Sequence, residues 1–104
     1  MPAVFKRSAA RLDLVERYVY LAEHSGTEVA ERFLHNAESS FADLSEYPLI
    51  GAPIILRSPL LAGLRKWRIK EFDETLIFYL PRNNGISVVR VLNAAQDWWS
   101  ALGL

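Results

Sequence analysis

Residues 76–92 read LIFYLPRNNGISVVRVL, and this stretch predicts two strands joined by a tight turn. Asn84-Gly85 stands at its centre, and both residues tolerate the positive φ angles that a short hairpin turn needs. Leu76–Leu80 is apolar at every position, as expected of a strand with both faces covered. We therefore expect an antiparallel hairpin of Leu76–Leu80 and Ile86–Leu92, with the first strand in the centre of a sheet.

A third strand is predicted at Leu64–Lys70, where the sequence reads LRKWRIK and four of the seven residues are cations. Glu71–Glu74 connects it to the next strand. Strand alternation places its side chains on two faces. Lys66, Arg68 and Lys70 are expected on one face, and Arg65, Trp67 and Ile69 on the other.

This concentration of positive charge has two interpretations. Cations at alternate strand positions lie about 7 Å apart, which is close to the spacing of successive phosphates along a nucleic acid strand. The strand would then receive nucleic acid or the acidic residues of a protein partner. Alternatively, it is an edge strand whose lysines and arginines prevent aggregation. The residues alone leave both interpretations open.

The first half of the chain predicts a helical hairpin. Residues 3–7 form a short strand candidate, and Ser8 can cap a helix that runs to about His24. A second helix follows as far as Tyr47-Pro48, and Ser25 and Glu28 form a capping-box pattern before it. Apolar residues keep the spacing of one helical face in both helices. They are Leu12, Val15, Tyr18, Val19 and Ala22 in the first helix, and Ala30, Phe33, Leu34, Ala37, Phe41 and Leu44 in the second.

The remaining segments complete the expected fold. Residues 48–63 are rich in proline and glycine, which predicts an irregular connection, and the tail AAQDWWSALGL predicts a short helix. At 104 residues the chain can bury one core but not two, so a single domain over residues 1–104 is expected. The fold class is α+β in the order β-α-α-β-β-β, with the helical hairpin packed on a small antiparallel sheet and a short C-terminal helix.

The net charge of zero conceals an asymmetry along the chain. Residues 8–47 carry eight acids against three bases, whereas residues 57–90 carry seven bases against three acids. Two surfaces with different roles are therefore expected. The absence of cysteine excludes a disulfide framework. No secretory signal or membrane-spanning run is visible, so we expect a cytoplasmic protein with no membrane partner.

The ordered set of these features resembles a known family. Two segments carry the resemblance, which covers about residues 3–98: ARLDLVERYVYLAEHSGTEVAERFLHNAESSFADLSEYPLIG and GLRKWRIKEFDETLIFYLPRNNGISVVRVLNAAQDW. They are similar to ParE/RelE-type toxins of bacterial type II toxin–antitoxin modules, and closer to the ParE branch through the long helical hairpin followed by YPLIG. The resemblance implies the fold expected above and a cognate antitoxin that folds across the toxin surface.

The resemblance also implies a cellular target. ParE-type toxins poison DNA gyrase, whereas RelE-type toxins cut mRNA on the ribosome. The chain departs from the common pattern after its last strand, where many ParE-like toxins have Leu-His-Gly-Ala-Arg-Asp and this chain has LNAAQD at Leu92–Asp97. Asn93 and Gln96 thereby replace an imidazole and a cation. The replacement bears on target and potency, and not on the fold.

The candidate binding residues follow from the basic strand and from the resemblance. Arg65 stands where the family usually carries an arginine, and Lys66, Arg68 and Lys70 are expected to join it in contacting the antitoxin or the target. Such cations would meet acidic residues of either partner.

Arg90 and the pair Trp98-Trp99 are secondary candidates for binding. Arg90 is expected to be partly buried and to need an acceptor, so an ion pair with Glu16 or Asp13 is the structural alternative. For the tryptophans, the structural alternative is that one covers the end of the core while the other is exposed. Exposed aromatic residues of this size often mark interfaces.

An enzymatic function has less support from the residues. A RelE-like nuclease needs cations at the phosphate and a group that moves the 2′-hydroxyl proton. His24 and His35 lie on predicted helices, and Tyr79 lies in a central strand. We expect no catalytic residue, no metal site and no cofactor. The expected function is a ParE-like toxin that inhibits gyrase by binding. The alternatives are a ribosome-dependent mRNA interferase and a module that retains only antitoxin binding.

Overall fold

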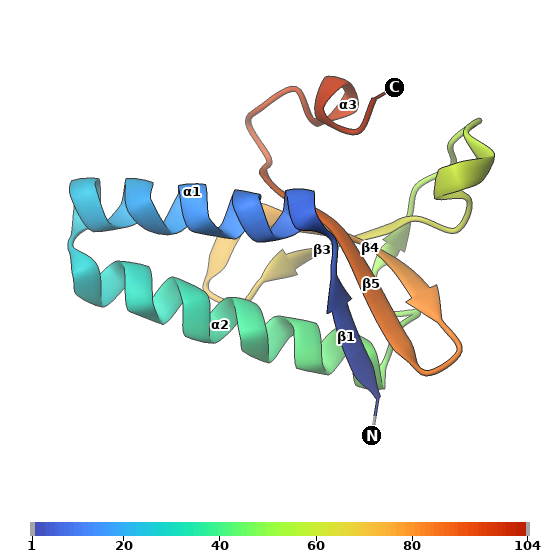
Figure 1. The fold of residues 1–104 in the computed structure, drawn as a ribbon, viewed down its shortest axis with the longest axis horizontal. Helices are drawn as coiled ribbons and strands as arrows, with labels where there is room; N and C mark the ends of the chain where they lie inside the picture. The colour runs from blue at the N-terminus through green and yellow to red at the C-terminus, as the bar shows by residue number, and fades with distance from the viewer. Residues whose placement is uncertain (1, 104) are drawn as a thin grey trace.

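The computed structural model describes residues 2–103, which form two main layers (Figure 1). One layer is a helical hairpin of α1 (Ser8–Ser25) and α2 (Thr27–Glu46), and the other is a five-stranded sheet in the order β1-β5-β4-β3-β2. The strands are β1 (Ala3–Lys6), β2 (Ala52–Pro53), β3 (Arg65–Ile69), β4 (Phe72–Arg82) and β5 (Gly85–Asn93). Two short helices, η1 (Pro59–Leu61) and α3 (Trp98–Ala101), contribute to a second core on the other face of the sheet.

The expected α+β class and element order are confirmed, with two refinements. β1 pairs with β5 in parallel, so the sheet is mixed and not purely antiparallel, while the other three pairs are antiparallel. β2 lies in the segment that was predicted to be irregular, and its two residues pair with the start of β3. A strand of two residues has no period that a sequence pattern can reveal.

The predicted hairpin of β4 and β5 forms, and β4 lies in the centre of the sheet. Arg82 pairs with Gly85, so the turn residues are Asn83 and Asn84 and not the expected Asn84-Gly85. Neither asparagine has a positive φ, and Gly85 is the first residue of β5. Gly85 has a φ of 134°, and a Cβ atom there would overlap the carbonyl oxygen of Ala3 in the neighbouring strand. Glycine is required because any side chain at this position would force β1 and β5 apart.

The two faces of β4 contribute to two separate cores, as its apolar sequence predicts. Ile77 and Tyr79 belong to the core under the helices, whereas Phe78 and Leu80 belong to the core on the opposite face. The second core is partly covered by side chains of η1, α3 and the loop after β2. A sheet with both faces covered explains why this strand is apolar throughout.

The face that α2 buries was predicted correctly, but the capping predictions were wrong. Ala30, Phe33, Ala37, Phe41 and Leu44 are fully buried. Gly26 is the N-cap of α2 and Arg7 is the N-cap of α1, and within residues 2–103 neither end has a side-chain capping hydrogen bond. The capping box of Ser25 and Glu28 is therefore not formed, and Ser8 is the first residue of α1 instead of its cap.

The face that α1 buries differs from the predicted one. Leu12, Val15 and Val19, here called the α1 stripe, are 58%, 58% and 46% exposed. The buried residues of this helix are Ala10, Asp13, Leu14 and Leu21, while Tyr18 and Ala22 are partly buried against the core. The prediction failed because α1 carries apolar residues on two sides. Spacing alone does not decide which side the sheet covers.

Candidate functional site

Arg65 begins β3 and holds the chain segment that follows α2. Its Nη1 donates hydrogen bonds to the carbonyl oxygens of Leu49, at 3.0 Å, and Gly51, at 2.6 Å. Two backbone acceptors on a segment without regular structure fix the path of the chain between α2 and β2. Arg65 thus has a structural task in the free protein, and its contact with a partner stays a prediction.

Tyr79 lies beneath the same segment and is fully buried, as predicted for a core residue. Its hydroxyl donates to the carbonyl oxygen of Pro48 at 2.8 Å and accepts from the backbone N–H of Gly51 at 2.9 Å. Burial raises the pKa of Tyr79 above its ordinary value, although the Gly51 N–H and the charge of Arg65 oppose this. The phenol is therefore protonated at neutral pH and acts as a structural donor.

Arg90 forms the ion pair that the sequence offered as its structural alternative. Its Nε and Nη2 donate to the two carboxylate oxygens of Asp13 at 2.7 and 2.9 Å, and its Nη1 donates to the carbonyl oxygen of Ala101 at 2.8 Å. The Asp13 carboxylate, which accepts from Arg90, raises the pKa of the guanidinium, while burial opposes this shift. Arg90 therefore connects β5 to α1 and α3.

The other three predicted cations, Lys66, Arg68 and Lys70, are here called the cation ridge. The Nζ of Lys66 lies 5.5 Å from the ring centroid of Trp98. Arg68 has its guanidinium 5.5 Å from the ring centroid of Trp67 and its Nε 3.6 Å from Asp73. Both partners in this last contact are exposed, so it contributes little to stability. Within residues 2–103, Lys70 has no carboxylate at ion-pair distance.

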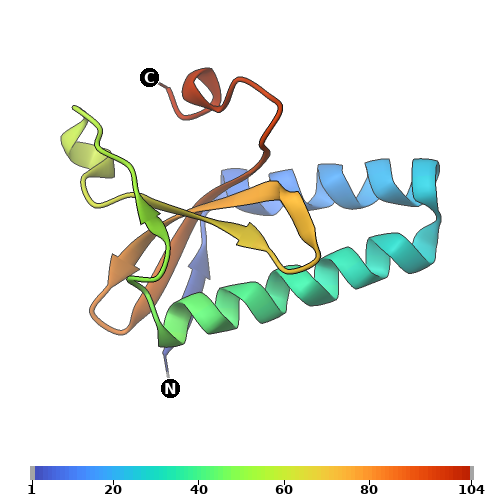
Figure 2. The ribbon, with the colours of Figure 1, turned by 180° about the vertical axis from the view of Figure 1, so that it is seen from behind.

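The regular alternation predicted for the cation ridge is interrupted at its end. A bulge shifts the β3–β4 register between Arg68 and Ile69, and β3 ends there. Lys70 lies in the following turn, where its backbone N–H donates to Ser40 Oγ of α2 at 3.0 Å. The view from behind shows this turn reaching toward α2 (Figure 2). The expectation that Lys70 continues the face of Lys66 and Arg68 is therefore wrong.

Two shallow hollows meet at Arg68. One, of about 330 Å³, lies between Lys66 and Asp73, and the other, of about 250 Å³, is lined by Lys70 and residues of α2. Trp67 lines both hollows as well. Each hollow combines cations with one acid, Asp73 in the first and Asp43 in the second, whereas Arg65 and Arg90 are engaged within the fold.

The two tryptophans divide as the structural alternative expected. Trp98 packs on Phe78 of the second core, with ring centroids 5.2 Å apart. Trp99 stacks on Trp98 at 3.9 Å and is 51% exposed. Trp98 therefore fixes α3 to the sheet, and Trp99 presents an aromatic face to solvent.

Sequence reasoning missed most of the exposed apolar surface. Besides the α1 stripe, large apolar residues are exposed in the segment between α2 and β3. They are Tyr47, Leu49, Ile50, Ile55 and Leu60. Large apolar side chains that are exposed together often mark interaction sites on soluble proteins. The signal was present in the sequence as apolar residues in and next to the proline-rich segment 48–63. Because no helix or strand was predicted there, these residues could not be assigned to a face.

His24, one of the two histidines weighed as proton-transfer groups, lies on α1 and not on the cation ridge. The Nδ1 of His24 is 2.8 Å from the carbonyl oxygen of Tyr20, and the two rings stack at the end of α1. Across residues 2–103, no cluster of three or more histidine, cysteine or acidic residues is arranged to hold a metal. In the same part of the chain, no helix has the length and apolar character needed to cross a membrane.

The described geometry can be compared with known proteins. A family model described as "ParE toxin of type II toxin-antitoxin system, parDE" matches residues 4–98. The chain is 32% identical over 92 residues to Toxin ParE3 of Caulobacter vibrioides (strain ATCC 19089 / CIP 103742 / CB 15), which covers 88% of this chain and 84% of that protein. The fold of the present chain is similar to that of a chain in the solved "Chromosomal ParDE TA system from P. aeruginosa", with a TM-score of 0.70 and 17% sequence identity. The match covers 89% of the present chain and 96% of the solved one.

Proposed function

The chain belongs to the ParE family of toxins from type II toxin–antitoxin systems, and on that premise we propose that it inhibits DNA gyrase by binding and is neutralised by a cognate antitoxin. Both partners are proteins, so the proposal requires protein-binding surfaces instead of a catalytic centre. Because gyrase acts in the bacterial cytoplasm, the proposal also places the toxin there.

The observation that carries the proposal is the α1 stripe. Its three apolar side chains lie on one side of an 18-residue helix, at spacings of three and four residues, and are about half exposed. An amphipathic segment of a partner can cover such a surface along the helix. The favourable free energy of binding would come from apolar area removed from water, at roughly 25 cal/mol per Å². A small substrate would leave most of this surface exposed.

The cation ridge supports an acidic partner. Lys66, Arg68 and Lys70 face the two hollows, and the contact of Arg68 with Asp73 is exposed and long. Asp73 and Asp43 also line the hollows, but the three cations outnumber them. Exposed positive charge of this kind would accelerate encounter with an acidic chain and fix its orientation. An antitoxin with acidic and apolar residues would have partners at the cation ridge for the first and at the α1 stripe for the second.

We favour inhibition by binding over RNA cleavage because Tyr79 and Asn93 are both engaged in hydrogen bonds of the fold. Tyr79 is buried and hydrogen-bonded through its hydroxyl. Asn93, which replaces the family's imidazole, accepts a hydrogen bond from the Ala95 N–H at 2.8 Å, while its own N–H donates to Gln96 at 3.1 Å. These two departures from the family pattern thus stabilise the turn after β5. Neither supplies a group that moves a proton at neutral pH.

Inducing the gene alone, and together with the neighbouring reading frame, tests the proposal in cells. We expect growth arrest with the toxin alone, relief by the neighbouring product, and intact mRNA during the arrest. A frameshifted copy of the gene is the control. Cleaved message that appears only on translating ribosomes would replace the proposal with an mRNA interferase. Normal growth with the toxin alone would leave a module that only binds its antitoxin.

A further inference from the structure

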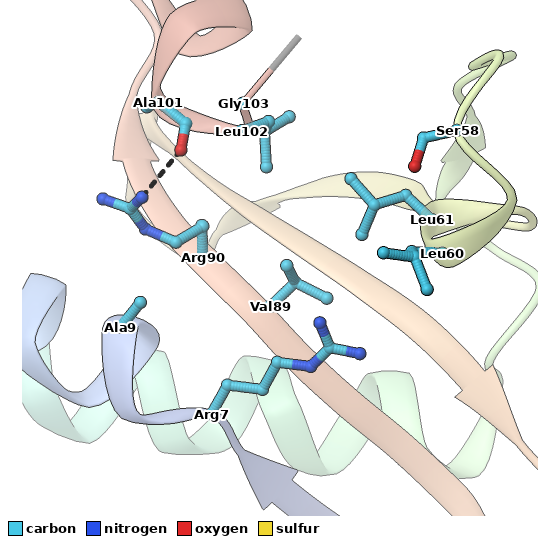
Figure 3. Close-up of a pocket in the computed structure, with 10 residues that line it drawn as sticks. All are labelled: Arg7, Ala9, Ser58, Leu60, Leu61, Val89, Arg90, Ala101, Leu102 and Gly103. Carbon is cyan, nitrogen blue, oxygen red and sulfur yellow. Dashed lines mark hydrogen bonds between the residues drawn. The ribbon is translucent and has the colours of Figure 1, made fainter.

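A cleft separate from the cation ridge opens on the sheet face away from the helical hairpin (Figure 3). Its volume is about 380 Å³, which lies toward the lower end of the range for ligand pockets. α3 and η1 form two of its walls, β5 forms its floor, and the junction of β1 and α1 closes one side. We call it the Arg7 cleft. Its walls and floor include Arg7, Leu60, Leu61, Val89, Arg90 and Leu102.

The Arg7 cleft combines apolar walls with one uncommitted positive charge. Of the described residues that line it, two are arginines and none is acidic. Arg90 is already bound to Asp13 and Ala101. Arg7 is half-buried, and within residues 2–103 it has no carboxylate at ion-pair distance. α1 begins directly after Arg7 with no acidic residue in its first turn, so the helix dipole adds to the positive potential there.

We propose that the Arg7 cleft binds an antitoxin segment in which a carboxylate lies beside a large apolar side chain. The carboxylate would pair with the Arg7 guanidinium, which can accept it in a two-pronged geometry. The apolar side chain would cover Val89 and Leu60, the latter 85% exposed in the free protein. This inference rests on the proposed neutralisation by an antitoxin and adds an anchor point on the face away from the helices.

An acidic peptide fits the Arg7 cleft better than a nucleic acid does. Single-stranded nucleic acids bind along grooves where several cations follow the backbone and aromatic rings stack on bases. Here Arg7 is the single free cation among the described lining residues, and the lining side chains are mainly aliphatic. Aliphatic walls around one guanidinium match a short peptide with one acidic and one apolar contact.

The test measures antitoxin affinity for variants of the full-length toxin, with the protein encoded by the neighbouring reading frame as probe. Arg7→Glu is expected to raise the dissociation constant about tenfold or more, and Leu60→Asp to raise it as well. The matched control is Arg82→Glu, which makes the same charge change at an exposed position in the β4–β5 hairpin. The control is expected to change the constant by less than about twofold.

A second readout does not depend on weakening the complex. The chain has no cysteine, so Ser58→Cys places a single thiol on the wall of the cleft, and Arg82→Cys places one outside it. Bound antitoxin is expected to protect the thiol at position 58 from alkylation and to leave the one at position 82 reactive.

The outcomes separate this inference from the proposed function. If the wild-type toxin does not bind the antitoxin, both are overturned. If binding is tight but Arg7→Glu leaves the affinity unchanged, or the thiol at position 58 stays equally reactive, only the cleft inference is overturned. Arg7-dependent binding of a single-stranded oligonucleotide, with antitoxin affinity unaffected by Arg7→Glu, would also overturn it. Loss of affinity together with thiol protection supports it.

Discussion

Arg90 and Asp13 form a bidentate ion pair that joins β5 to α1. Nε and Nη2 of Arg90 donate to the two carboxylate oxygens of Asp13 at 2.7 and 2.9 Å. Asp13 is buried and also accepts a hydrogen bond from the backbone N–H of Val91 at 2.9 Å. The three bonds fix which side of α1 turns toward the sheet. Because Asp13 points inward, the α1 stripe is left in solvent. A contact inside the fold thus determines the surface that we propose for the antitoxin.

The first prediction concerns this ion pair. Asp13→Ala is expected to lower the free energy of unfolding by about 3 kcal/mol, since it leaves the Arg90 charge without its carboxylate partner and the Val91 N–H without its acceptor. Urea unfolding of the purified protein measures the loss. The control Glu23→Ala removes an exposed acid from the same helix and should change stability by less than about 0.5 kcal/mol. Equal effects of the two substitutions would contradict the structural role of Asp13.

A second prediction concerns the Tyr79 hydroxyl. Tyr79→Phe removes its hydrogen bonds with Pro48 and Gly51 and should reduce the free energy of unfolding by about 1–2 kcal/mol. Urea unfolding of the wild type and the Tyr79→Phe variant at neutral pH measures this difference in free energy. A neutral or stabilising effect would show that the loop after α2 does not depend on this hydroxyl.

The raised pKa of Tyr79 predicts how this contribution depends on pH. Burial is the main cause of the shift, so the folded protein holds the phenolic proton more tightly than the unfolded chain does. The stability that this pKa difference contributes is fully present below the pKa of Tyr79 in the unfolded chain, near 10. It is lost as the pH rises through the pKa of Tyr79 in the folded protein. The stability difference between wild type and Tyr79→Phe should therefore shrink above pH 10. A stability difference that grows above pH 10 would mean that folding lowers the pKa of Tyr79 instead of raising it.

How far the sequence predicts the molecule depends on the range of the interactions involved. The β4–β5 hairpin and the buried face of α2 rest on local turn chemistry and on one unambiguous apolar face, and both were predictable. The α1 stripe was not, because the partner that orients α1 is Arg90, far along the chain. The bulge after Arg68 that displaces Lys70 is likewise a property of strand pairing and leaves no periodic signal in the sequence.

A third prediction separates binding from folding on α1. Val15→Ser, on the α1 stripe, is expected to weaken antitoxin binding roughly tenfold while changing stability by less than about 0.5 kcal/mol. Leu14→Ser, one residue away but buried, should instead cost about 2–4 kcal/mol of stability. Calorimetric titration and urea unfolding of both variants check the pair. Unaltered affinity of the Val15 variant would remove the α1 stripe from the interface.

A fourth prediction concerns the cation ridge. Reversing charge at Arg68 and Lys70 together, as Arg68→Glu and Lys70→Glu, should slow association with the antitoxin and flatten the salt dependence of that rate. Because the same cations are expected to contact the target, toxicity of the toxin expressed alone should also fall. The control reverses Arg32 and Arg82, two exposed cations elsewhere, and so produces the same net charge. Stopped-flow rates of association with the antitoxin, measured at several salt concentrations, distinguish the two double variants. If both pairs behave alike, net charge and not the ridge controls the encounter.

The central claim, inhibition of gyrase by binding, is tested most directly by a supercoiling assay with purified components. Relaxed plasmid, ATP and gyrase are incubated with increasing toxin, alone or premixed with the neighbouring frame's product. We predict a concentration-dependent loss of supercoiled product that an equimolar amount of the antitoxin abolishes. Full supercoiling at toxin concentrations well above that of gyrase, with a toxin preparation that arrests growth in cells, would contradict the claim.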